Sequence, residues 1–184
     1  MIFVNLGQAK AKGRDAKRFQ DMGEIIKALH LYWSDHGGYP AATCPCSNGG
    51  WETSDADPNQ WLEFLQPYLG QKIPVDPINK RVGGFSFFGP RPGNYFYAYY
   101  KYGVPYAPCP EINHPFAIIT ISKLENAVPP NLPEDGMPLP EEINMPRARC
   151  GDPGPDGICT VAEYNAGQCR DWSQEFDYSV ILVD

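Results

Sequence analysis

A long helical pattern at the start of the chain most constrains what it can fold into. Along residues 5–36, apolar and small residues recur at spacings of three and four, which is the pattern of one continuous helix. At about 1.5 Å per residue, this helix is close to 48 Å long. Its apolar stripe contains only small residues between Leu6 and Ala16 and large ones from Phe19 onward, and Gly37-Gly38 follows as a helix end. The stripe consists of Leu6, Ala9, Gly13, Ala16, Phe19, Met22, Ile25, Ile26, Leu29, Tyr32 and Trp33.

Charge is distributed unevenly along the chain. Residues 1–18 contain five basic residues and one acidic residue, a net charge of +4, whereas the whole chain carries −7 and the remainder therefore −11. This basic collar predicts contact with anionic lipid headgroups or with an acidic neighbouring subunit, and an ordinary solvated helix face explains it equally well. The acidic body argues against nucleic acid as a partner. The collar consists of Lys10, Lys12, Arg14, Lys17 and Arg18.

Three segments together resemble one known family. Residues 9–40 form a basic stretch, an amphipathic helix and the turn Asp-His-Gly-Gly-Tyr-Pro; residues 73–79 read Ile-Pro-Val-Asp-Pro-Ile-Asn; residues 117–126 end in Leu-Glu-Asn. These segments resemble the type IV pilins and the pseudopilins of type II secretion. The resemblance covers roughly the first 125 residues.

The resemblance implies an α+β fold, with a long N-terminal helix packed on a small antiparallel sheet. The prolines and cysteines of the remaining residues add a loop-rich, disulfide-stapled C-terminal region. We expect a single pilin-like domain over residues 1–184: a helical stalk (1–37), a head with the sheet (38–128), and a Pro-rich excursion, a calcium-type loop and a final strand (129–184). The implied function is that of a structural, non-enzymatic subunit of an extracellular or periplasmic filament. Its partners would be further copies or related pilin subunits, and an apolar segment before the present sequence would anchor the full-length protein in the inner membrane.

The middle of the chain predicts the parts of the head. Asp57-Pro58 can begin a short helix that Pro67 ends. Residues 116–121 and 176–183 read as strands. Residues 85–106 hold ten of the twenty-four aromatic residues, which form either a stacking platform for sugar or single-stranded DNA, or a strand whose alternate rings face the long helix. We favour the strand.

Six cysteines lie outside the long helix and indicate disulfides in an oxidising compartment. Cys44 and Cys46 are too close in sequence to favour pairing with each other, whereas Cys150 with Cys169 is a plausible pair because it would close the acidic loop between them. Six cysteines allow fifteen connectivities, which the sequence leaves open. The positions are Cys44, Cys46, Cys109, Cys150, Cys159 and Cys169.

Residues 152–163 match the twelve-position calcium loop. Acidic or hydroxyl side chains occupy positions 1, 5, 9 and 12, glycine occupies position 6, and position 7 offers its backbone carbonyl. Gly154 at position 3 departs from the pattern because it has no side-chain oxygen. We predict that the loop binds Ca²⁺ as a single structural site. Its ligands are Asp152, Asp156, Ile158, Thr160 and Glu163.

Two other functions remain as alternatives. A calcium-dependent adhesin or carbohydrate-binding module would present the 85–106 aromatic residues and the acidic loop to a glycan or another surface ligand. A hydrolase would need two of its carboxylates about 5–9 Å apart in one cleft, and their spacing in the sequence gives no sign of this. The hydrolase candidates are Asp76, Asp135, Glu141 and Glu142.

Overall fold

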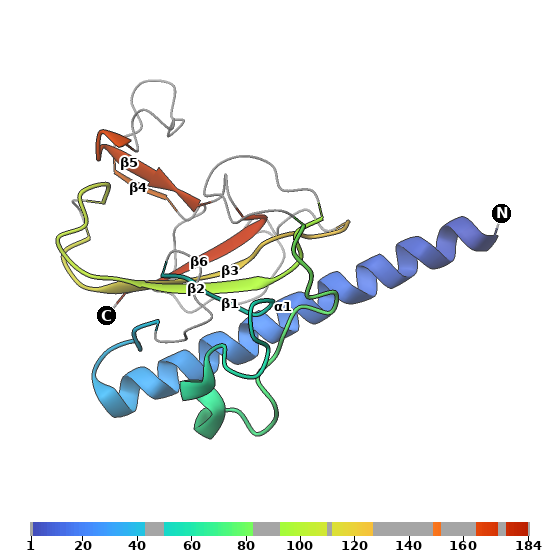
Figure 1. The fold of residues 1–184 in the computed structure, drawn as a ribbon, viewed down its shortest axis with the longest axis horizontal. Helices are drawn as coiled ribbons and strands as arrows, with labels where there is room; N and C mark the ends of the chain where they lie inside the picture. Colours follow the sequence, from blue (N-terminus) through green and yellow to red (C-terminus); the bar gives the residue numbers. More distant parts are fainter. Residues whose placement is uncertain are drawn as a thin grey trace.

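A computed structural model describes residues 2–42, 50–82, 93–109, 112–126, 149–151, 165–172 and 176–183. In these residues one long helix lies across one face of a four-stranded antiparallel sheet, so the α+β class is confirmed (Figure 1). The strand order in this sheet is β1-β2-β3-β6, and β4 and β5 form a separate pair. The elements are α1 (Ile2–His36), β1 (Glu52–Thr53), η1 (Glu63–Tyr68), β2 (Tyr97–Tyr102), β3 (Phe116–Ile121), β4 (Arg149–Gly151), β5 (Cys169–Asp171) and β6 (Tyr178–Val183).

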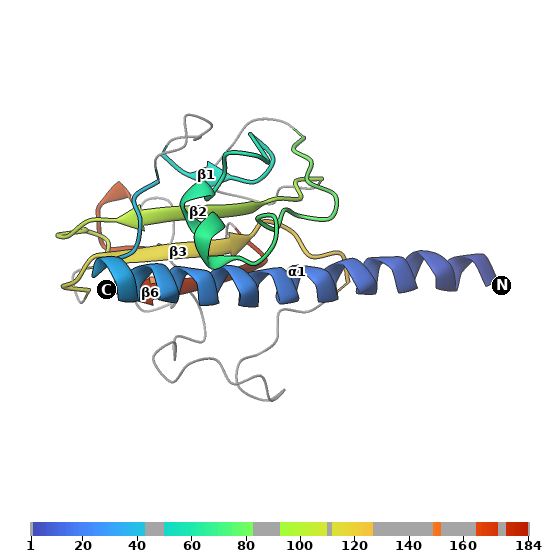
Figure 2. The same ribbon diagram turned by 90° about the horizontal axis from the view of Figure 1, so that it is seen from below.

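The long helix is present as predicted. It ends where Gly37 adopts a φ of 71° and donates its backbone N–H to the carbonyl of Trp33 at 2.7 Å. Only the C-terminal part of α1 is covered by the head, and its N-terminal part extends beyond the sheet (Figure 2). Residues 6–10 are all exposed, whereas Met22, Ile25 and Leu29 are fully buried. The large residues of the stripe therefore lie in the part of the helix that packs on the head.

The sheet is formed mainly by three six-residue strands. β3 pairs with β2 from Phe116↔Tyr102 to Ile121↔Tyr97, and with β6 on its other side. Residues 116–121 form a strand as predicted, and the final strand begins at Tyr178, two residues later than expected. Because successive side chains of a strand point to opposite faces, each strand contributes to both sides of the sheet.

Two hydrophobic cores lie on the two faces of the sheet. Tyr97 and Tyr99 of β2 pack on the α1 side with Ile25 and Leu29, whereas Phe96 and Ala98 pack on the other side. The second core is rich in aromatic rings, including Trp51, Tyr102, Phe116, Trp172 and Phe176. Residues 96–99 are all buried and residues 97–102 form β2, which confirms the strand interpretation for this part of the aromatic run. Residues 85–92 of the run lie outside the described residues.

The short helix differs from its prediction. Asp57 does not cap an α-helix; its carboxylate accepts the N–H of Asn59, two residues on, and residues 57–62 form turns. Leu62 then adopts a left-handed backbone, with φ 50°, so the helical segment η1 begins only at Glu63 and is a 3₁₀ helix. Pro67 lies inside η1 instead of ending it. Trp61, Leu62 and Leu65 of this segment are buried in the core on the α1 side of the sheet.

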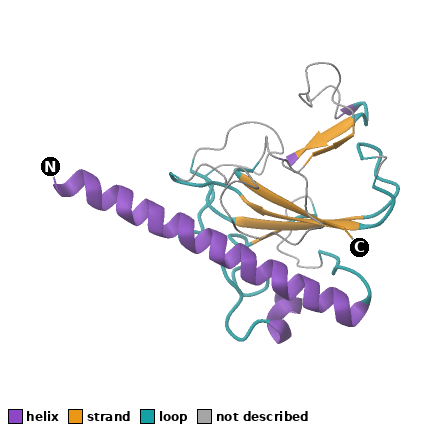
Figure 3. Ribbon diagram, turned by 180° about the vertical axis from the view of Figure 1, so that it is seen from behind, coloured by secondary structure: helices purple, strands orange, loops and turns teal. Residues whose placement is uncertain are grey.

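The described C-terminal residues include a second, smaller sheet. β4 and β5 pair antiparallel, with Cys150 opposite Arg170 and Gly151 opposite Cys169, on the side of the main sheet away from α1 (Figures 1 and 3). This register brings the backbone of Cys150 next to the strand of Cys169, and the pairing of the two cysteines stays a prediction. Cys109 and Cys169 are buried and are both half-cystines.

Candidate functional site at the stalk-head junction

A buried arginine lies near the N-terminal end of the contact between the long helix and the head. The side chain of Arg18 is 0% exposed. Its Nε donates to Oδ2 of Asp76 at 2.7 Å and its Nη2 to Oδ1 of the same carboxylate at 3.1 Å, which forms a bidentate pair. Nη1 donates to Asp15 at 2.7 Å and to Glu125 at 3.0 Å. One guanidinium therefore binds carboxylates from three separate segments of the chain.

The electrostatics of this cluster keep Arg18 charged. Burial alone opposes the charge, but the hydrogen bonds and charges of the surrounding carboxylates, Asp76 foremost, outweigh it and raise the pKa of Arg18 above its ordinary value. The guanidinium carbon also lies 5.2 Å from the centre of the Tyr95 ring, within the range of a cation–π contact. Because the charge is buried and its partners come from separate segments, the cluster holds those segments together only when all of its members are present.

The same carboxylates also bind backbone. Asp76 Oδ1 accepts the N–H groups of Ile78 and Asn79 at 2.8 and 3.2 Å, which fixes the turn that follows it. Asp15 accepts the N–H groups of Glu125 and Asn126 at 3.0 and 2.8 Å. The three segments that carried the family resemblance, in α1, at 73–79 and at 117–126, therefore meet at Arg18.

Arg14 extends the cluster toward the surface. Its Nε donates to Oε1 of Glu125 at 2.6 Å, and this hydrogen bond, with that from Arg18, holds the pKa of Glu125 below its ordinary value although burial opposes the shift. Glu125 thus bridges a partly exposed arginine and a buried one. The ionised form of Glu125 is the form that joins the loop after β3 to the helix.

A second polar contact lies one turn further along α1. The hydroxyl of Tyr97 donates to Oδ2 of the buried Asp21 at 2.9 Å, and Lys17 forms an ion pair with the same carboxylate. Burial raises the pKa of Asp21, and the bonds from Lys17 and Tyr97 oppose that shift. Burial and the neighbouring Asp21 charge also raise the pKa of Tyr97, so the phenol stays protonated and acts as a donor.

The basic collar is therefore divided in two. Arg14 and Arg18 form ion pairs with carboxylates of the head, and the exposed Lys17 pairs with Asp21 of its own helix. Lys10 and Lys12 are exposed and pair with no residue that the structure describes. Neither of the two sequence-based interpretations, contact with a partner or a solvated face, fits Arg18. Its position in the sequence could have indicated burial. Arg18 lies four, seven and eleven residues before Met22, Ile25 and Leu29, on the same side of the helix as these buried residues.

The predicted metal ligands lie outside the described residues. The structure therefore does not test the calcium site, whose predicted ligands are Asp152, Asp156, Ile158, Thr160 and Glu163. Within the described part of the chain, no group of three or more His, Cys, Asp or Glu side chains could hold a metal ion. The carboxylates of Asp15, Asp76 and Glu125 converge, but they do so around the guanidinium of Arg18.

The described residues bring no second hydrolase candidate next to Asp76. The carboxylate of Asp76 is buried and bound to Arg18, which gives it a structural role. Asp135, Glu141 and Glu142 lie outside the described residues.

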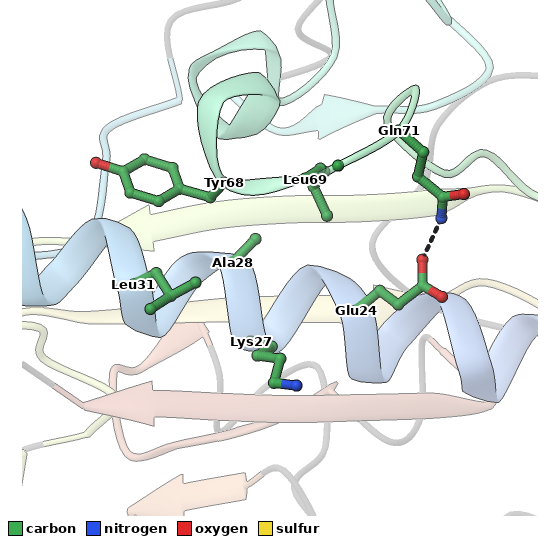
Figure 4. Close-up of a pocket in the computed structure, with 8 residues that line it drawn as sticks. Glu24, Lys27, Ala28, Leu31, Tyr68, Leu69 and Gln71 are labelled. Atoms are coloured by element: carbon green, nitrogen blue, oxygen red, sulfur yellow. Dashed lines mark hydrogen bonds between the residues drawn. The ribbon is translucent and has the colours of Figure 1, made fainter.

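A shallow groove of about 400 Å³ runs beside the C-terminal half of α1. Figure 4 shows Ala28 on the side of the helix next to the segment that carries Tyr68 and Leu69, with Leu31 one turn along and Lys27 extending away from that segment. Gln71 closes one end by donating to Oε2 of Glu24 at 2.5 Å. At the other end Tyr68 donates to Oδ2 of the exposed Asp35 at 2.9 Å. The lining residues are Glu24, Lys27, Ala28, Leu31, Tyr68, Leu69, Gly70 and Gln71.

In the parts of the chain that the structure describes, no helix is both long and apolar enough to cross a membrane. Comparison with protein-family models, with curated proteins and with solved structures gave no significant match.

Proposed function

We propose that the chain is the stalk and head of a structural subunit of an extracellular or periplasmic filament, either a type IV pilus or a type II secretion pseudopilus. The observation that carries the proposal is the junction at Arg18, where the three segments that resemble this family meet. A filament subunit needs its head fixed rigidly to the helix that joins it to its neighbours. A charged cluster with partners on three segments provides such a fixed connection.

The exposed N-terminal part of α1 supports the same proposal. Residues 6–10 are all exposed to solvent, and the side chain of Leu6 is 54% exposed. A helix end without tertiary packing is only marginally stable in water, which favours a role in which another molecule packs against it. In the full-length protein an apolar segment would continue this helix into the inner membrane or into the centre of the filament.

The experiment that tests the proposal is to sequence the gene upstream of Ile2. We expect a short basic leader that ends in glycine, then about twenty apolar residues. Immunogold labelling with an antibody against this chain should then decorate filaments on the parent cell. A plain secretion signal, or a native start at Met1, would contradict the filament and leave the calcium-dependent binding module as the better account.

Calcium and disulfides are proposed to make the head durable outside the cell. The carboxylate of Glu163 would bind Ca²⁺ with both oxygens, so Glu163→Ala should abolish calcium binding and lower the melting temperature. Calorimetric titration with Ca²⁺ and melting curves with and without a chelator measure both effects. Glu63→Ala, an exposed glutamate in η1, is the matched control and should leave both unchanged. Identical wild-type melting curves with and without chelator would disprove the structural role of calcium.

The adhesin or carbohydrate-binding module remains the alternative. It required an exposed row of aromatic side chains, and residues 96–99 are instead buried in the two cores. No described residue favours this function over the filament subunit.

A further inference from the structure

Two surfaces near the ends of α1 lack a partner in the described part of the chain. The first is the stalk segment, residues 6–13, where Leu6 is 54% exposed and Lys10 and Lys12 are exposed as well, although Ala11 in the same segment is buried. The second is the groove beside the C-terminal half of α1, where Leu31 is 48% exposed. Both present a large apolar side chain to solvent, and both lie on the same helix.

The two surfaces have the same spacing between a leucine and a charged residue, and their charges are opposite. In the stalk segment a lysine, Lys10, follows Leu6 after four residues. At the groove a carboxylate, Asp35, follows Leu31 after four residues. Residues four apart lie on the same side of a helix, one turn from each other. The stalk segment and the groove therefore offer the same arrangement, an exposed leucine with a charge one turn later, with opposite signs of charge.

We propose that the stalk segment of one copy docks along the groove of a second copy, with Leu6 against Leu31 and Lys10 beside Asp35. The contact rests on the proposed filament function and specifies which surfaces meet. Burial of the two leucines supplies the apolar part of the interaction. Tyr68 binds Oδ2 of Asp35, so the ammonium of Lys10 approaches Oδ1.

Charge also selects the orientation of the two helices. Lys27 lies four residues before Leu31 and is exposed on the same side of α1 (Figure 4). If the helices ran antiparallel with the leucines in contact, Lys10 would lie beside Lys27, and the like charges would repel. In the parallel arrangement Lys10 meets Asp35 instead. The helices of neighbouring copies therefore run in the same direction.

This geometry produces an open assembly. Leu6 and Leu31 are 25 residues apart, so each copy is displaced from the last by about 38 Å along the helix, at about 1.5 Å per residue. The two contacting surfaces are different, which makes the interface heterologous, and a translation along the helix axis does not bring the series back to its start. Repetition of the contact builds a linear row of subunits.

The experiment combines charge reversal with site-directed cross-linking of the purified chain. Lys10→Asp and Asp35→Lys are made singly and together, and association is measured by sedimentation velocity at low ionic strength. We expect each single reversal to weaken association on the order of tenfold, because attraction becomes repulsion. The double variant should restore it. Lys12→Asp, which makes the same charge reversal two residues away, is the control and should change association less.

Cross-linking locates the contact. A photo-reactive phenylalanine analogue in place of Leu6 should cross-link to residues 27–35 of another copy, and mass spectrometry of the product identifies them. A chain that stays monomeric at every concentration, single reversals that associate like the wild type, or cross-links to another surface would each overturn this contact. The filament function is tested separately by the upstream gene sequence and immunogold labelling, so filaments that form without this contact disprove the contact alone.

Discussion

Two successive parts of α1 pack on the same head by different physical means. Between Asp15 and Asp21 the helix is held by buried ion pairs and hydrogen bonds, whereas Met22, Ile25 and Leu29 are held by apolar burial. Apolar contact stabilises any well-packed neighbour of the right volume. A guanidinium bound by carboxylates from three segments accepts only one arrangement of those segments. The comparison indicates that the apolar part stabilises the contact by burial and that the charged part determines which loops lie against the helix.

The largest effect should come from breaking the charged part. Arg18→Met keeps much of the side-chain length but leaves Asp15, Asp76 and Glu125 without their shared cation. We expect a loss of about 4 kcal/mol in the free energy of unfolding at neutral pH, because uncompensated buried charge is costly. Urea denaturation measures it, and Lys12→Met, an exposed position on the same helix, should change stability by less than about 0.5 kcal/mol. Equal stability of the two variants would show that the cluster is not what holds the junction.

The next effect should come from the apolar part. Leu29→Ala removes a fully buried side chain and should cost about 3 kcal/mol, from lost burial and the cavity left behind. Leu31→Ala, on the exposed side of the same helix, is the matched control and should cost little. The pH dependence of stability distinguishes the two parts. The loss of unfolding free energy in Leu29→Ala should not change with pH. The loss in Arg18→Met should become smaller in acid as the carboxylates become protonated. Parallel pH profiles for the two variants would contradict the distinction.

Glu125→Gln should give a smaller and pH-dependent effect. The folded protein holds the pKa of Glu125 below its ordinary value, so ionisation of this carboxyl favours folding above that ordinary value, and the contribution disappears as the pH falls through the folded pKa. We expect the variant to be about 1 kcal/mol less stable than the wild type at pH 7. The two should converge in strong acid. Denaturation midpoints of the wild type and the variant across the acidic range measure this effect. A stability difference between the two that grows toward low pH would contradict the prediction.

The smallest effect should come from Tyr97→Phe. The variant keeps the ring in the core and removes only the hydroxyl that donates to Asp21, so a loss of about 1 kcal/mol or less is expected at neutral pH. Because that bond opposes the raised pKa of Asp21, the pKa of Asp21 should rise further in the variant. Carboxyl titration by NMR measures the pKa, and an unchanged value would show that the bond contributes little to the charged form.

The sequence by itself determined the elements that depend on local pattern. The spacing of apolar residues gave the long helix, the glycine pair its end, and the alternation of side chains the strand at Phe116–Ile121. These features depend on backbone periodicity and on conformations open to few residue types, both of which can be read without knowing the neighbours. The same local reasoning misjudged the start of η1, because Leu62 adopts a left-handed backbone, with its N–H bound by Glu52.

Only the tertiary structure decided what the charged residues do. The five basic residues of the collar look alike in the sequence, but Arg14 and Arg18 pair with carboxylates of the head, whereas Lys10, Lys12 and Lys17 are exposed. The difference arises from partners such as Asp76 and Glu125, which lie 58 and 107 residues from Arg18 along the chain. Whether a charge is solvated or buried depends on which distant carboxylates the fold brings within a few ångströms, and no local pattern contains that information.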